Sequence, residues 1–138
     1  MDVVVVVDVD ETGTVPLVQD VHGPSRMNYR KLDVYQKSVR FLPIAARIAD
    51  GLAAPWASLA DQVRRASLSV VLNIAEGSGK TSGPDQRRFY AIARGSAMEC
   101  GAIVDACVSL KLVEPPAAEQ AEELLSAVVQ MLSKMARG

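Results

Sequence analysis

Apolar side chains recur every three or four residues through most of this chain, and this spacing constrains the fold more than any other feature of the sequence. Such a spacing places one apolar stripe along an α-helix. It predicts one helix from Asp33 to Leu52, a second from Ala57 to Ala75, a third that begins at Pro84, and a fourth that begins at Pro115 and Pro116. Short connections between four such helices predict an all-α fold, an antiparallel up-down four-helix bundle.

Each predicted helix has one stripe that we expect to face the core. The stripes are, in chain order, Tyr35, Val39, Leu42, Ala46 and Ala49; Leu59, Val63, Ala66, Val70 and Ile74; Phe89, Ala93, Ser96, Cys100, Ile103, Cys107 and Leu110; and Ala121, Leu124, Val128, Leu132 and Met135. Pro43 interrupts the first helix, and an internal proline removes one hydrogen bond. Two shorter helices are therefore the alternative for that segment.

The second predicted helix is apolar on more than one side, because Leu68, Val71 and Leu72 lie off its stripe. A helix of this kind needs apolar cover on a second face. In a domain of this size another subunit is the natural cover.

Residues 1–29 differ from the helical part and form a separate acidic, valine-rich leader, whereas residues 30–138 form the bundle domain. A β-branched run from Val3 to Val7 and a second run from Val15 to Val21 flank a turn signal. The leader is therefore an extended or disordered segment: a small hairpin, a disordered or loosely docked stretch, or the product of a misplaced start site, since Met27 directly precedes the helices. Residues 1–27 hold five acidic residues against one basic residue, and the rest hold eleven against fourteen.

Composition narrows the class of protein further. The chain contains no apolar run long enough to cross a membrane, and its amino terminus lacks a basic signal region, so we expect a cytoplasmic protein. Cys100 and Cys107 are spaced seven residues apart, which places them on one helix face about 10 Å apart, too far to bridge. We interpret both as small core residues.

The segment from Gly77 to Ser82 resembles a phosphate-binding loop only superficially. That motif needs a glycine at the position of Ile74 and a preceding strand, whereas the preceding residues have a helical period. We interpret Gly77 and Gly79 as left-handed residues that end the second helix, with Lys80 complementing the helix dipole.

Catalytic chemistry finds little support in the sequence. His22, the single histidine, lies in the leader, so a serine or cysteine hydrolase would lack its usual base. Glu76 and Glu99 lack the Glu-x-x-His pattern of a dimetal bundle site, and we expect each to pair with an arginine such as Arg65 or Arg94, or with a helix end. An enzyme that uses Lys80 and Glu76 on a phosphorylated substrate is a minor alternative. We expect no catalytic residue, no cofactor and no metal.

Basic side chains are the remaining candidates for a binding function. Rows of them would meet RNA phosphates without reading bases, if assembly repeated them on several copies. The alternative is a solvated, salt-bridged face. The candidate nucleic-acid-binding residues are Arg40, Arg47, Arg64, Arg65, Lys80, Arg87, Arg88 and Arg94.

Three linked motifs carry a resemblance to a known family. They are Gln62-Val-Arg-Arg-Ala66, Asn73-Ile-Ala-Glu-Gly-Ser-Gly79, and Arg88-Phe-Tyr-Ala-Ile-Ala-Arg-Gly-Ser96 with Glu99. They resemble the 23S ribosomal RNA intervening-sequence proteins, a four-helix-bundle family that is similar in turn to the accessory variability protein of diversity-generating retroelements. The motif residues that we single out as structural are Gln62, Asn73, Glu76, Gly77, Gly79, Phe89, Gly95, Ser96 and Glu99.

The resemblance covers about residues 30 to 135 and implies an antiparallel four-helix bundle that assembles as a homopentameric, barrel-like ring without known enzymatic activity. For the retroelement relatives it implies binding to nucleic acid and to a reverse transcriptase through a basic surface. We therefore expect a non-enzymatic, homo-oligomeric scaffold, pentameric by the resemblance and associated with RNA. The alternative is a protein adaptor for a reverse transcriptase or another enzyme, with no direct role in RNA binding.

Overall fold

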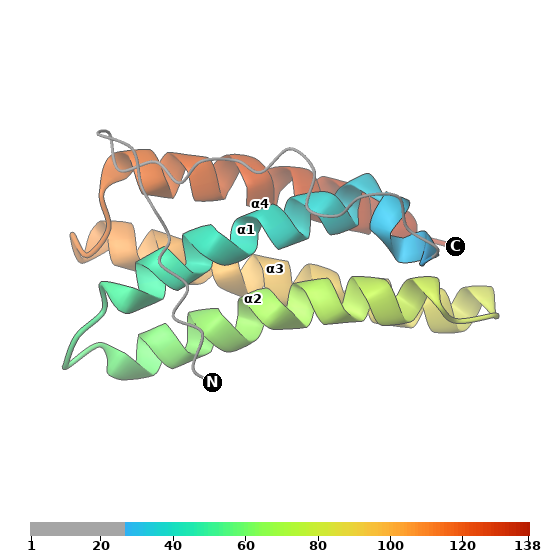
Figure 1. Cartoon of the computed structure of the whole chain (residues 1–138), viewed down its shortest axis with the longest axis horizontal. Helices are drawn as coiled ribbons and strands as arrows, with labels where there is room; N and C mark the ends of the chain where they lie inside the picture. Colours follow the sequence, from blue (N-terminus) through green and yellow to red (C-terminus); the bar gives the residue numbers. More distant parts are fainter. Residues whose placement is uncertain (1–26) are drawn as a thin grey trace.

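Four antiparallel helices follow one another in the computed structural model, which describes residues 27–138 (Figure 1). A short 3-10 helix, η1 (Asn28–Lys31), precedes α1 (Asp33–Asp50), α2 (Ala57–Ser78), α3 (Gly83–Ser109) and α4 (Pro115–Met135). The described residues contain no strand. The predicted all-α, up-down bundle is confirmed, whereas the leader interpretations concern residues outside the described part, apart from residues 27–29.

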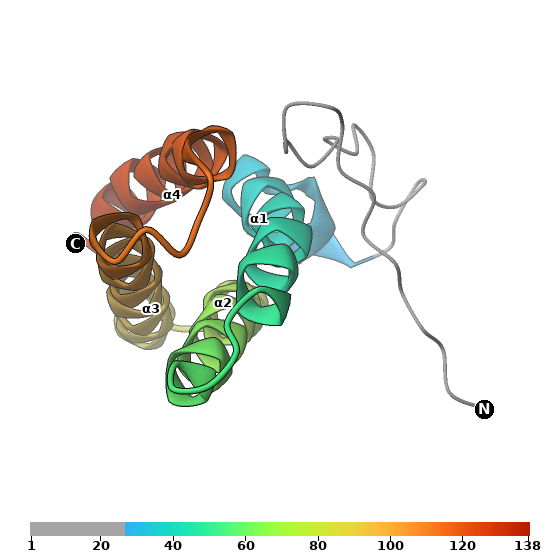
Figure 2. The same cartoon turned by 90° about the vertical axis from the view of Figure 1, so that its left-hand side faces the viewer.

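The helices pack in chain order around the bundle, so that each one contacts the helix before it and α4 returns to α1 (Figure 2). The α2–α3 turn, the start of α1 and the end of α4 share one end of the bundle (Figure 1). We call this the α2–α3 end. The α1–α2 and α3–α4 turns lie at the opposite end. None of the helices in this described part is both long and apolar enough to cross a membrane.

The core confirms the predicted stripes of α2 and α4 almost completely. Val63, Ala66, Val70 and Ile74 of α2 are buried, as are the α4 stripe residues from Ala121 to Leu132. Leu59 and Met135, at the outer ends of these stripes, are half-buried. Both helices therefore present to the core the face that their apolar period predicts.

The predicted stripe of α1 is wrong in its middle. Val39, Leu42 and Ala46 are only half-buried, while Phe41, Ile44, Ala45 and Ile48 are fully enclosed. Because α1 is apolar around much of its circumference, two overlapping stripes fit the same spacing. The packing of α1 between α2 and α4 selects the second one.

The stripe of α3 is displaced by one position at two points. Tyr90 and Ala97 are buried in place of Phe89 and Ser96, which are half-buried beside α2, and Leu110 is exposed because it caps the end of the helix. Ala93, Cys100, Ile103 and Cys107 are buried as predicted. Both cysteines are free and lie in the core, which confirms their interpretation as core residues.

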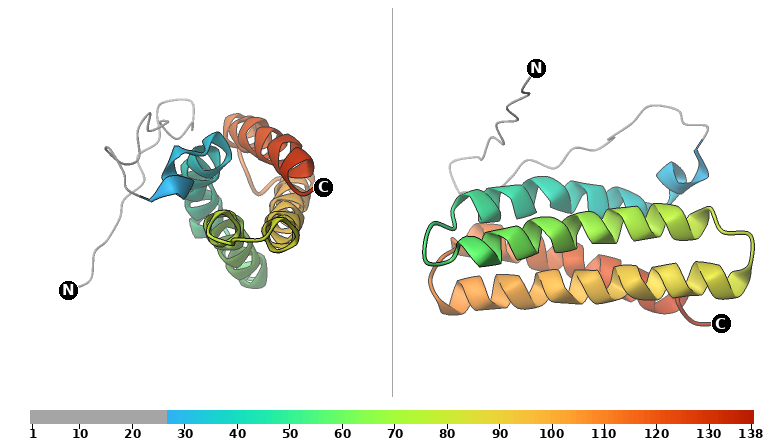
Figure 3. Two further views of the ribbon diagram at one scale, coloured as in Figure 1. Left: turned by 90° about the vertical axis from the view of Figure 1, so that its right-hand side faces the viewer. Right: turned by 90° about the horizontal axis from the view of Figure 1, so that it is seen from below.

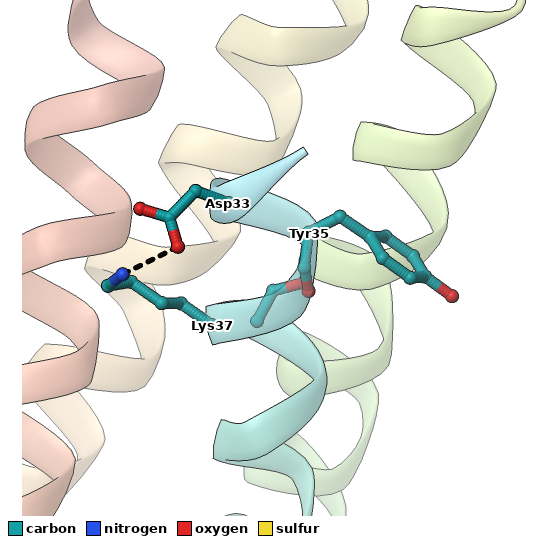
Figure 4. A network of polar contacts seen from close by, with 4 residues as sticks. Asp33, Tyr35 and Lys37 are labelled. Atoms are coloured by element: carbon teal, nitrogen blue, oxygen red, sulfur yellow. Dashed lines mark hydrogen bonds and ion pairs between the residues drawn. The ribbon is translucent and has the colours of Figure 1, made fainter. Parts of the chain in front are cut away.

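Local signals account for the start of α3 more fully than for the other helix ends. Pro43 lies inside a single α1, so the alternative of two shorter helices is wrong. At the start of α3, Ser82 Oγ accepts a hydrogen bond from the backbone N–H of Asp85 at 3.2 Å, and Pro84 occupies the first turn as expected. In the first turn of α1, Lys37 Nζ lies 2.7 Å from Asp33 Oδ1, with Tyr35 directed to the other side of the helix (Figure 4).

Helix α2 runs to Ser78, three residues beyond the predicted end at Ala75. Gly77 therefore lies inside the helix. Gly79, which follows the last turn, has φ −84° and ψ −8°, a right-handed conformation. The interpretation of Gly77 and Gly79 as left-handed terminators is wrong. Gly77 instead packs against α3, as described below.

Candidate functional site

The motif residues gather along the seam between α2 and α3, which run side by side through the length of the bundle (Figure 3). Antiparallel packing brings the start of α2 beside the end of α3, and the end of α2 beside the start of α3. The residues on this seam are Gln62, Asn73 and Gly77 on α2, and Phe89, Ser96 and Glu99 on α3.

Gly77 allows the two helices to approach closely near the α2–α3 turn. A Cβ at this position would lie 2.9 Å from a carbon of the Tyr90 ring and 3.0 Å from Phe89 Cβ. Real Cβ contacts are longer, so any larger residue would separate the helices. The glycine that the sequence marks as a motif position is explained by this contact.

A chain of polar side chains crosses the middle of the seam. Asn73 Nδ2 donates to the backbone carbonyl of Ser69 at 2.8 Å and to Ser69 Oγ at 3.0 Å, and Ser69 Oγ lies 2.7 Å from Ser96 Oγ. Asn73 and Ser96 were singled out from the sequence, but Ser69, which joins them, was missed. Only its spacing of four from Asn73 on a helix pointed to it.

A groove of about 380 Å³ opens beside these serines toward the opposite end of the bundle. Its walls carry an amide, a guanidinium and a carboxylate from Gln62, Arg65 and Glu99. Such a set can exchange hydrogen bonds with a polar partner surface. In the described part of the chain no group of three or more His, Cys, Asp or Glu residues could hold a metal ion.

Large apolar side chains border this polar seam and face outward. The exposed fraction is 49% for Leu68, 60% for Leu72 and 43% for Ile92. We call the surface formed by Arg65, Leu68, Leu72, Ile92 and the groove the α2–α3 face. Exposed apolar side chains beside polar groups are the materials of an interface, whose core is apolar and whose rim is polar.

The expected pairing of the two glutamates with arginines is wrong for Glu76. This carboxylate lies 3.8 Å from Lys80 Nζ, one helical turn away. Arg94 instead donates from Nε to Ser133 Oγ at 2.7 Å, which ties α3 to α4. Arg65 and Glu99 line the same groove.

Basic residues do not form one continuous row. Lys80 and Arg88 both lie over the ring of Phe89, each 4.9 Å from its centroid, and the guanidinium of Arg87 lies beside Gly83 and Gly138. Arg47, Arg64 and Arg65 lie toward the opposite end, where Arg64 contacts Asp50 at 3.2 Å and Asp61 at 3.6 Å. Arg40 lies in the first half of α1. The candidate phosphate contacts therefore separate into two groups.

Charge is strongly polarised along the bundle. The half that contains the α2–α3 turn holds ten Lys and Arg residues and three Asp and Glu residues, whereas the other half holds four and eight. The net charge of the bundle is therefore small because a basic half and an acidic half partly cancel. We call the part around the α2–α3 turn, which carries Lys80, Arg87, Arg88, Lys134 and Arg137, the basic end.

The perturbed titratable groups belong to the core and not to the α2–α3 groove. Burial raises the pKa of the Tyr35 and Tyr90 phenols and of the Cys107 thiol, and raises the pKa of Cys100 to about 12, with Glu99 nearby adding to the rise. These shifts keep the groups neutral inside the bundle. The raised pKa values reflect burial in the core, and a thiol with a raised pKa is not an activated nucleophile.

One comparison with known proteins matches the chain over most of its length. A family model described as 23S rRNA-intervening sequence protein matches residues 30–134. The match spans α1, α2 and α3, all of α4 except Met135, and the whole α2–α3 seam. No curated protein matches this chain.

Proposed function

Because the chain belongs to the 23S rRNA-intervening sequence protein family, we propose that it is a non-enzymatic scaffold that assembles with copies of itself through the α2–α3 face. The observation that carries this proposal is the exposure of Leu72 and Leu68 beside a satisfied polar seam. A pentameric ring is the assembly that the resemblance implies. Association with RNA through the basic end is the second part of the proposal.

Burial of the exposed leucines provides the driving force for assembly. Leu68 and Leu72 are about half exposed, so burying the rest of each contributes about half of the 1.5–3 kcal/mol that full burial of a leucine contributes. Leu68 and Leu72 are one helical turn apart, with Arg65 one turn before Leu68, so they form a short ridge along α2. A ridge of this kind fits between the helices of another bundle.

The chemistry of the α2–α3 groove supports a binding role over a catalytic one. A catalytic centre brings a nucleophile or base with a shifted pKa into a cleft. In the described residues the groups with shifted pKa values are two tyrosines and two cysteines of the core. The groove itself presents Gln62, Arg65 and Glu99, which suit recognition of a polar surface.

Substitution of the ridge tests the assembly. Leu72→Glu places a charge where a neighbour would bury it, and should convert the oligomer into smaller species. Leu110→Glu, at another exposed leucine near the opposite end, is the matched control and should leave the subunit number unchanged. Light scattering after size-exclusion chromatography measures the mass, and circular dichroism checks the fold. An oligomer that survives Leu72→Glu intact contradicts the proposal.

The basic end supports the RNA part of the proposal. In a ring whose subunits lie with their bundle axes parallel, the basic ends of all copies share one rim and form a continuous phosphate-binding surface. Arg88→Ala should weaken RNA binding and lower the slope of log K against log salt by about 0.7 per lost phosphate contact. Arg47→Ala, at the opposite end, is the matched control. Salt-independent or undetectable RNA binding by the assembled protein would favour the protein-adaptor alternative.

A further inference from the structure

Two glycines in α3 have no role inside the subunit. A Cβ built at Gly95 or at Gly101 would meet no atom within 4 Å. Glycine weakens a helix interior relative to alanine, so a subunit standing alone gains nothing from either one. A close approach by another chain explains both, in the way that Tyr90 explains Gly77.

The two glycines belong to different surfaces of α3. Gly95 points away from the bundle with Ala91 and Ala102, since these residues share one helix face. Gly101 lines a second groove of about 380 Å³, between α3 and α4, whose rim carries Asp105 and Glu122. Met98 lies between the two surfaces and is 51% exposed. We call the face formed by Ala91, Gly95 and Ala102, together with Met98 and this groove, the α3–α4 surface.

The ridge of α2 complements the α3–α4 surface in shape and charge. Leu68 and Leu72 project from the bundle, whereas the groove between α3 and α4 is a hollow whose α3 wall includes the small residues Ala97, Gly101 and Ala102. Arg65 heads the ridge, and the carboxylates of Asp105 and Glu122 border the groove. Neither surface complements itself, because the ridge would meet a ridge and the acids would meet acids.

Ridge and groove also lie at the same level along the bundle. Arg65 and Ser69 line one groove with Ser96 and Glu99, and the α3–α4 groove begins at Ala97 and Met98. A rotation about an axis parallel to the helices therefore brings the ridge of one copy to the groove of the next without sliding along the bundle.

We infer that the α2 ridge of one copy docks on the α3–α4 surface of the next copy, with Arg65 facing Asp105 and Glu122. This inference rests on the self-assembly proposed above and adds its geometry. The interface joins two different surfaces, so every copy offers one of each, and the assembly forms a closed ring when the rotation from copy to copy divides a full turn.

A charge exchange tests this pairing. Arg65→Glu, and separately Asp105→Lys with Glu122→Lys, should each raise the dissociation constant of the assembly by about tenfold or more, measured by sedimentation at several protein concentrations. The triple variant that combines all three changes restores the opposite charges across every interface and should recover most of the wild-type affinity. Arg47→Glu, combined with the same two lysine substitutions, has the same net charge and should not recover it.

The outcomes separate the two claims. A monomeric wild-type protein overturns the proposed function and this inference with it. A wild-type oligomer that neither charge reversal weakens overturns this inference alone. If both charge reversals weaken the assembly and the triple variant does not restore its affinity, the pairing of Arg65 with Asp105 and Glu122 is also wrong. An interface between two like surfaces would give this result.

Covalent capture provides a second readout that does not depend on charge. Leu68→Cys combined with Met98→Cys, treated with a flexible bis-maleimide, should give a ladder of linked subunits that ends at the ring size. Each single cysteine variant should remain a single band, since only unlike surfaces meet. Cys100 and Cys107 are buried thiols and should stay unreacted. Linked dimers from Leu68→Cys alone would overturn the inference.

Discussion

The hydroxyl of Ser69 on α2 lies 2.7 Å from the hydroxyl of Ser96 on α3. Asn73 Nδ2 donates to Ser69 Oγ, and either serine hydroxyl can donate in the contact between Ser69 and Ser96. The three side chains form one connected chain across the seam. They fix the α2–α3 pair at the place where the outward-facing leucines begin.

Removing this serine pair gives the first prediction. Ser69→Ala and Ser96→Ala should each lower the free energy of unfolding by about 1 kcal/mol, because each leaves a partner unsatisfied. The double variant should cost less than the sum of the two, since both single changes break the same bond. Urea unfolding at one fixed protein concentration measures all three values. Strictly additive losses would show that the hydroxyls are not coupled.

The two kinds of glycine in the bundle give the second prediction. Gly77→Ala forces a methyl group against the Tyr90 ring and should lower the free energy of unfolding by about 1–3 kcal/mol. Gly95→Ala meets no atom of its own subunit, so the folded monomer should tolerate it, while the assembly should weaken. Unfolding curves and subunit mass are measured for both. A neutral Gly77→Ala would contradict the close approach of α2 and α3 at this residue.

The buried thiols give a prediction about pH. The pKa of Cys100 is raised from 9.0 to about 12. Between these two pH values the folded protein keeps the thiol proton, whereas the unfolded chain has released it. The stability from this group is complete below about pH 9 and is lost as the pH rises through about 12. Unfolding midpoints at pH 8 and pH 10.5 should therefore differ more for the wild type than for Cys100→Ala. Equal pH slopes would mean that the thiol is accessible to water.

The amino-terminal cap of α3 gives the fourth prediction. Ser82→Ala removes the acceptor for the Asp85 N–H and should cost about 1 kcal/mol of stability. Ser109→Ala, at an exposed position at the other end of the same helix, should change stability by less than about 0.5 kcal/mol. Thermal unfolding of the two variants makes the comparison. A larger loss for Ser109→Ala would contradict the cap.

The fold was predictable because four long apolar patterns agree with their turn signals. Pro84, Pro115 and the stripes of α2 and α4 lie where the spacing placed them. The stripe of α1 was not predictable in detail, because Val39 and Phe41 both fit an apolar spacing. Which of them is buried depends on how α2 and α4 pack against the helix.

The candidate site was predictable only in part, for a different reason. Spacing places residues on one face of one helix but does not say which residues of the next helix lie beside them. Ser69 therefore looked like an ordinary surface serine until α3 brought Ser96 to it. The same limit applies to the basic residues. Spacing along α2 did not show that Lys80 lies beside Arg88 of α3, where both contact the ring of Phe89.

Native mass spectrometry of the full chain at low micromolar concentration, with and without nuclease treatment, is the decisive test of self-assembly. We expect a closed oligomer of five subunits that persists after nuclease treatment, and copurified RNA that is lost. An oligomer that keeps its mass and carries no RNA would leave the scaffold in place and remove the RNA role. A monomer under both conditions would contradict the account.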